Sequence, residues 1–105
     1  MPAALEVSAL LRRAEASGGF AVVLRRGDPD RGALIVQVAD RGVAIALLQR
    51  RLADDFTYRW QRFEVPERGT AAFLADQSRI DPDLWAIELD IPDAERFVAE
   101  MTASP

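Results

Sequence analysis

The sequence predicts an α+β fold, a mostly antiparallel sheet of about five strands with three helices, in the order α-β-β-β-β-α-β-α. Three segments repeat apolar residues with the spacing of one helix face, and five others are short and apolar or alternate in polarity. Clusters of glycine, proline and aspartate separate these segments, as they do at turns. Strands and helices in this order favour helices packed against one sheet.

The first helix is expected over residues 5–16. Its apolar stripe consists of Val7, Leu10, Leu11 and Ala14, which share one face of a helix. Gly18-Gly19 then ends it, because glycine adopts the left-handed conformation of a helix C-terminus without a Cβ clash.

Three apolar strands are expected over residues 20–25, 33–39 and 43–48, joined by turns at 26–32 and 40–42. The short connections predict a meander of three antiparallel strands. The strands are apolar on both faces, so we expect the sheet to be covered on both sides or to pair with another copy.

Residues 56–63 alternate as a fourth strand, with Phe56, Tyr58 and Trp60 on one face. The simplest interpretation is that this face packs on a helix. The phase breaks at Phe63 and Val65, which indicates a bulge or the end of the strand.

The C-terminal third predicts a helix, a strand and a second helix. Pro66 fits the start of the first helix, which continues with helical spacing to residue 77. Residues 84–89 form the fifth strand, with Trp85, Ile87 and Leu89 pointing inward. Asp90 is expected to cap the last helix, with Pro92 in its first turn.

The chain has 105 residues, half of them hydrophobic, which predicts a single domain over residues 1–105 with residues 102–105 frayed. No stretch reaches the length of a membrane span, and the first residues do not resemble a secretory signal. We therefore expect a cytoplasmic protein.

Histidine, cysteine and lysine are all absent. These side chains supply most nucleophiles, neutral-pH proton carriers and soft metal ligands in enzymes. Their absence excludes imidazole, thiol and amine chemistry, and we expect no cofactor.

Two blocks of the sequence are similar to a known family. Residues 7–13 with 18–33, and the motif Asp81-Pro82-Asp83-Leu84-Trp85, resemble domain-of-unknown-function family 1491, a group of small alphaproteobacterial proteins. The resemblance covers nearly the whole chain and is weakest over residues 90–105. It implies a bacterial cytoplasmic protein and carries no activity or site residue.

Two Asp-Pro-Asp triplets are the best candidates for a metal site. If the turns meet in space, Asp28, Asp30, Asp81 and Asp83 offer the oxygen ligands that Mg²⁺ and Ca²⁺ prefer, and a metal-dependent hydrolase is the alternative function. The simpler interpretation is that each triplet is a turn before a strand.

Arginines near the first triplet and in the fourth strand are candidates for contacts with an anion or a protein partner. They are Arg25, Arg26, Arg31, Arg59 and Arg62. The segment 50–63 also interleaves arginine with aromatic residues, which is typical of single-stranded nucleic-acid platforms. The net charge of −4 argues against that second alternative.

Charge is unevenly distributed along the chain. Residues 41–68 hold six arginines and four acids, whereas residues 69–105 hold two arginines and eight acids. Together with the two-sided apolar strands, this favours a non-catalytic interaction module that self-associates, as a homodimer for example, or docks to a protein partner. We expect neither nucleic acid nor a membrane as its partner.

Overall fold

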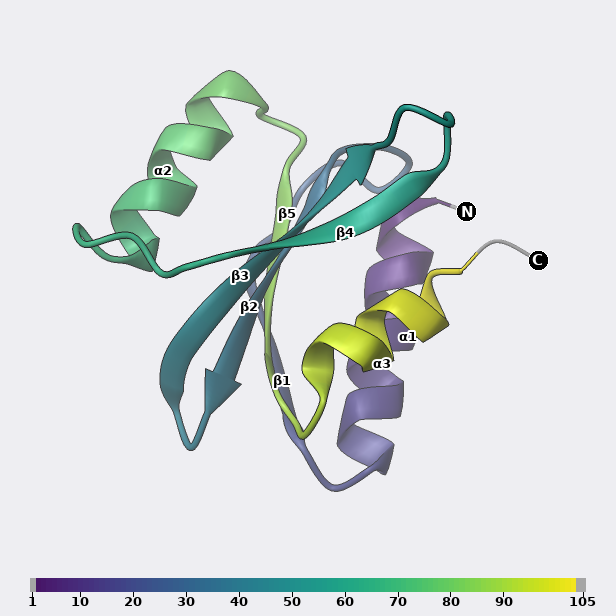
Figure 1. Ribbon diagram of the computed structural model, residues 1–105, viewed down its shortest axis with the longest axis vertical. Coiled ribbons are helices and arrows are strands. Elements are labelled where there is room, and N and C mark those ends of the chain that lie inside the picture. Colours follow the sequence, from purple (N-terminus) through teal and green to yellow (C-terminus); the bar gives the residue numbers. More distant parts are fainter. Residues whose placement is uncertain (1, 104–105) are drawn as a thin grey trace.

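The computed structural model describes residues 2–103, which form three helices and one five-stranded sheet (Figure 1). The helices are α1 (Ala3–Ala16), α2 (Thr70–Ile80) and α3 (Ala94–Met101). The strands are β1 (Phe20–Arg25), β2 (Leu34–Asp40), β3 (Val43–Leu52), β4 (Tyr58–Phe63) and β5 (Trp85–Asp90). The predicted fold class and element order are therefore confirmed.

The strand order is β1-β5-β2-β3-β4, with one parallel pair, β2 with β5, among antiparallel neighbours. The predicted meander is correct for β2 and β3, but β1 does not pair with β2. Strand β5 lies between them, with Val36 beside Ile87 on one side and Val23 beside Ile87 on the other. The central strands β2 and β5 are accordingly the most buried.

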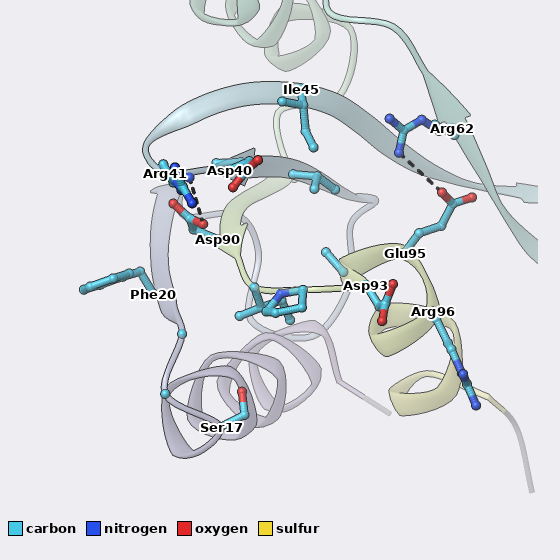
Figure 2. A pocket seen from close by; sticks show the side chains of 17 residues that line it. Ser17, Phe20, Asp40, Arg41, Ile45, Arg62, Asp90, Asp93, Glu95 and Arg96 are labelled. Atoms are coloured by element: carbon cyan, nitrogen blue, oxygen red, sulfur yellow. Dashed lines mark hydrogen bonds and ion pairs between the residues drawn. The ribbon is translucent and has the colours of Figure 1, made fainter.

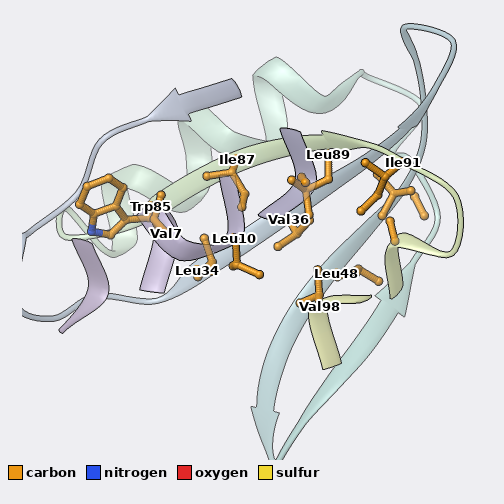
Figure 3. Packing of buried hydrophobic residues seen from close by; sticks show 14 residues of the cluster. Val7, Leu10, Leu34, Val36, Leu48, Trp85, Ile87, Leu89, Ile91 and Val98 are labelled. Carbon is orange, nitrogen blue, oxygen red and sulfur yellow. The ribbon is translucent and has the colours of Figure 1, made fainter. Parts of the chain in front are cut away.

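One face of the sheet packs against α1 and α3, and the other packs against α2 (Figure 1). The larger core joins Leu10 of α1 and Val98 of α3 to alternate residues of the central strands, including the inward-facing Trp85, Ile87 and Leu89 that the sequence predicts (Figure 3). The smaller core places Leu74 of α2 against Ile35 and Leu47. Burial of this apolar surface from both sides is the main stabilisation of the fold.

The first helix ends as predicted. Gly18 has a φ of 90°, and its N–H donates to the carbonyl of Glu15. Gly19 lies so close to Ile91 that a Cβ there would come within 2.1 Å of its side chain. The glycine pair thus ends α1 and lets the chain pass close to Ile91 as it enters β1.

Helix α2 begins at Thr70 rather than at Pro66. Gly69 has a φ of 90°, outside the helical region, and its N–H closes a turn with the Pro66 carbonyl. Pro66 therefore opens a turn before the helix. Strand β4 ends at Phe63, where the break in alternation predicts it.

The predicted cap of the last helix is also wrong. Helix α3 begins at Ala94, and Asp93 precedes it in the left-handed conformation without a side-chain cap. The Asp90 carboxylate instead accepts the N–H groups of Arg41, at 3.3 Å, and Gly42, at 2.8 Å. Asp90 therefore holds the β2–β3 turn.

At the C-terminal end, the Thr102 hydroxyl donates to the Val98 carbonyl and accepts the indole N–H of Trp60. Ser104 and Pro105, also expected to fray, lie outside the described residues. No helix in the described part of the chain is long and apolar enough to cross a membrane.

Candidate functional site

The two Asp-Pro-Asp turns meet in space. The Asp28 N–H donates to the Asp83 carbonyl at 3.1 Å, and the indole N–H of Trp85 donates to the Asp28 carbonyl at 2.7 Å. The Arg25 guanidinium adds a bond of 3.0 Å to the Pro82 carbonyl. We call this junction of residues 27–33 with residues 81–85 the aspartate clasp.

Glycine makes this close approach possible. A Cβ on Gly27 would lie 2.1 Å from the Asp83 carbonyl oxygen, and so would a Cβ on Gly32. Gly32 also has a φ of 122°, which side chains rarely tolerate. The clasp is therefore built from backbone contacts that only glycine permits.

The carboxylates of the clasp bind backbone amides of its own turns. Asp28 Oδ1 accepts the N–H groups of Asp30, at 2.9 Å, and Arg31, at 3.2 Å. Asp81 accepts the N–H of Asp83 at 3.0 Å through Oδ1 and that of Ala33 at 3.4 Å through Oδ2. This is the turn-forming role of aspartate.

The metal alternative gains no support from this arrangement. Within residues 2–103, no three acidic side chains come together as ligands of one metal ion. Although the turns that carry Asp28, Asp30, Asp81 and Asp83 lie side by side, their carboxylates do not converge. The clasp therefore links the β1–β2 connection to the start of β5 and forms no ligand set.

The candidate arginines fall into two separate groups. Arg25, Arg26 and Arg31 lie at the clasp, where the Arg26 guanidinium stacks 5.3 Å from the centre of the Trp85 ring. Arg59 and Arg62 lie on β4, at the opposite edge of the sheet.

The two β4 arginines form exposed ion pairs, Arg59 with Asp55 at 3.0 Å and Arg62 with Glu95 at 3.5 Å. The pKa of Asp55 is lowered chiefly by the hydrogen bond from the Thr57 hydroxyl, then by the Thr57 N–H and by Arg59. The five arginines therefore do not lie together, and their role as contacts for an anion or a partner stays a prediction.

The predicted aromatic face of β4 is only partly formed. Phe56 and Tyr58 are 84% and 70% exposed, so neither packs on a helix as predicted. Phe56 lies in a turn with a φ of 63°, before the strand begins.

Trp60 alone packs as the sequence indicates, toward α3. Its ring lies 5.0 Å from the Arg50 guanidinium, and its N–H donates to Thr102 at 2.8 Å. Arg50 in turn forms a bidentate ion pair with Glu6 of α1. The three aromatic residues therefore do not form one continuous stacking platform.

A broad groove that the sequence did not reveal lies at the N-terminal end of α3 (Figure 2). It has a volume of about 950 Å³ and is lined by both acidic and basic side chains. Within it Asp90 binds the β2–β3 turn, and Glu95 pairs with Arg62. Two acidic side chains of the groove, Asp90 and Glu95, are therefore already engaged within the fold.

The most distinctive exposed surface lies on β1. Phe20, Val22 and Leu24 are 77%, 48% and 42% exposed, and Phe20 lies at the rim of the groove in Figure 2. Beside them is a shallow hollow of about 470 Å³ whose lining includes Glu15, Glu88 and residues 18–22. The sequence did not reveal this surface, because β1 is as apolar on both faces as the buried strands β2 and β5, although only one face of β1 is covered.

These features define a small α+β protein whose exposed apolar surface lies on a sheet edge. The family model described as "Protein of unknown function (DUF1491)" matches residues 1–99, and the chain belongs to this family. The resemblance seen in the sequence is therefore confirmed.

Three solved structures are similar to this fold. The crystal structure of a DUF1491 family protein from Caulobacter crescentus CB15 is 34% identical, with a TM-score of 0.76 over 92% of this chain and 94% of that chain. An NMR structure of a DUF1491 family protein from the same organism is 31% identical, with a TM-score of 0.72 over 92% and 91%. The solution structure of protein Atu0922 from A. tumefaciens is 28% identical, with a TM-score of 0.73 over 100% and 97%. No curated protein matches the chain.

Proposed function

We propose that this protein is a non-catalytic interaction module of the bacterial cytoplasm that associates through the exposed apolar surface of β1. The observation that carries the proposal is the exposure of Phe20, Val22 and Leu24 on an edge strand. Burial of large apolar side chains is the main favourable contribution to protein association, and aromatic residues dominate many interfaces.

Two further observations support a binding role over catalysis. The chain lacks histidine, cysteine and lysine, so it lacks the common nucleophiles and proton carriers. Asp28 and Asp81, the best placed carboxylates, already accept backbone N–H groups within the clasp.

Replacement of one exposed aromatic residue tests the proposal, and a second provides a matched control. We expect Phe20→Asn to weaken self-association by about tenfold, because Phe20 supplies the largest apolar side chain of the β1 surface. Phe56→Asn is expected to leave association unchanged, since Phe56 is equally exposed but lies in the β3–β4 turn. Asparagine tolerates the positive φ of Phe56, so the control variant should fold.

Sedimentation velocity of the wild-type chain and both variants, from micromolar to millimolar concentration, measures the effect. Circular dichroism confirms that each variant is folded. A wild-type chain that stays monomeric over the whole range, or equal losses in both variants, would contradict the proposal.

A further inference from the structure

Strand β1 has an outer edge that is unpaired in the described part of the chain. It pairs with β5 on one side, and no other strand of the described residues pairs with it on the other. Edge strands are normally protected by charged residues or proline, because their unpaired N–H and C=O groups can pair with another strand. Strand β4, at the other edge, carries Arg59 and Arg62. Strand β1 carries one charge, Arg25, at its end and a β-bulge between Val23 and Arg25, whereas its residues 20–24 contain neither a charge nor a proline.

The sequence of β1 is complementary to itself in an antiparallel arrangement. With a two-fold axis through Val22, Phe20 of each copy lies opposite Leu24 of the other, and Ala21 lies opposite Val23. Every pair is apolar. Directly opposed apolar residues stabilise antiparallel strands, and this register leaves no charge within the paired segment.

Charge complementarity argues for the same arrangement. Continuing the register places Arg25 and Arg26 of one copy opposite Gly19 and Gly18 of the other. These glycines lie in the hollow whose lining includes Glu15 and Glu88. The guanidinium groups of Arg25 and Arg26 also contact Pro82 and Trp85 of their own chain. The two-fold axis brings each of these basic strand ends toward the acidic hollow of the other copy.

We propose that a second copy of this chain occupies the β1 surface, by antiparallel pairing of β1 with β1 about an axis through Val22. This inference rests on the proposed function and names the partner and register of that same surface. The two sheets then join into one continuous sheet. Because a single strand pair buries less than the roughly 1,200–2,000 Å² of a stable interface, the dimer is expected to be weak and reversible.

The absence of cysteine allows a direct test of the register. Val22→Cys introduces the single thiol of the chain, and the proposed axis brings the two copies of that thiol together. Mild oxidation should give a disulfide-linked dimer on non-reducing gels. Ile80→Cys, at the end of α2 and 79% exposed, is the control and should remain monomeric.

Mixing two cysteine variants distinguishes this register from registers shifted along the strand. Phe20→Cys and Leu24→Cys should each cross-link poorly alone but efficiently when mixed, because the two positions oppose each other. Efficient cross-linking of Phe20→Cys with itself, or equal cross-linking of Val22→Cys and Ile80→Cys, would overturn the proposal.

Charge reversal tests the contacts at the two ends of the paired β1 strands. Glu15→Arg places like charges together and should weaken association about tenfold. The double variant Glu15→Arg with Arg26→Glu should recover most of that loss. Glu15 is exposed on α1, and thermal melting of each variant separates lost association from lost folding.

The proposed interaction function and the proposed pairing of β1 with β1 can fail separately. If the wild-type chain associates but Val22→Cys cross-links no better than Ile80→Cys, the β1 pairing is wrong while the interaction function stands. If the wild-type chain does not associate and Val22→Cys does not cross-link, both fail.

Discussion

Thr57 controls the ionisation of Asp55 in the turn before β4. Its hydroxyl donates to Asp55 Oδ1 at 2.6 Å and its N–H donates to the same oxygen at 3.1 Å. These bonds favour the carboxylate, and the hydroxyl is the largest cause of the lowered pKa. The stabilisation is therefore present above the ordinary pKa of 3.8 and is lost as the pH falls below it, through the folded-state pKa.

We expect Thr57→Val to raise the pKa of Asp55 toward its ordinary value, because the variant keeps the N–H bond but loses the hydroxyl. Arg59→Gln should raise the same pKa by less, since Arg59 is a smaller cause. Carboxyl carbon shifts followed by NMR during acid titration measure both. A larger effect of Arg59→Gln would show that the ion pair dominates this turn.

At the residue scale, burial could be predicted where a regular pattern sets it, as for Trp85, Ile87 and Leu89. The roles of polar residues could be predicted only where their partners are local, as in the turns of Asp28 and Asp81. Asp90 was expected to bind the helix that follows it, yet its carboxylate binds the turn at Arg41 and Gly42. That partner is distant in sequence, and no local pattern records it. Phe56 was assigned to β4 by alternation, but a positive φ places it in the preceding turn.

Two glycines allow the effect of a steric clash to be separated from that of backbone strain. Gly27 lies in the aspartate clasp, and Gly42 lies in the β2–β3 turn. Gly27→Ala is expected to destabilise the fold by about 2–3 kcal/mol, because its Cβ would meet a backbone carbonyl that cannot move independently. Gly42→Ala has open space around its Cβ but a φ of 81°, and should cost about 1 kcal/mol through that conformation alone. Urea unfolding of both variants gives the comparison, and equal losses would show that the clasp can relax.

At the element scale, the sequence predicts each helix and strand and the pairing of β2 with β3, but not the position of β5 between β1 and β2. Periodicity and turn residues define the elements locally. The pairing of β1 depends on the clasp, which seats the start of β5 against the β1–β2 connection through Trp85 and Asp28. In the same contact, Asp28 and Asp81 accept backbone N–H groups of the two turns.

The whole molecule should show a gradient of protection across its sheet. The central strands β2 and β5 are buried on both faces and paired on both edges, so their amides should exchange slowest. The edge strands β1 and β4 should exchange faster. Hydrogen exchange read by mass spectrometry at low concentration measures this order.

Repeating hydrogen exchange at high protein concentration tests whether association protects β1. Pairing between copies should slow exchange in β1 and leave β4 unchanged. Slowing confined to β4 would place the contact at the wrong edge of the sheet.

The late position of β5 in the chain also affects how the protein is made. Strand β5 occupies the gap between β1 and β2, and it is the last strand to leave the ribosome. Until it emerges, β1 has no neighbour within the chain, and its apolar residues are exposed along both edges. The nascent chain therefore cannot complete its sheet before β5 has emerged, and until then β1 of one nascent chain is accessible to β1 of another chain made from the same messenger.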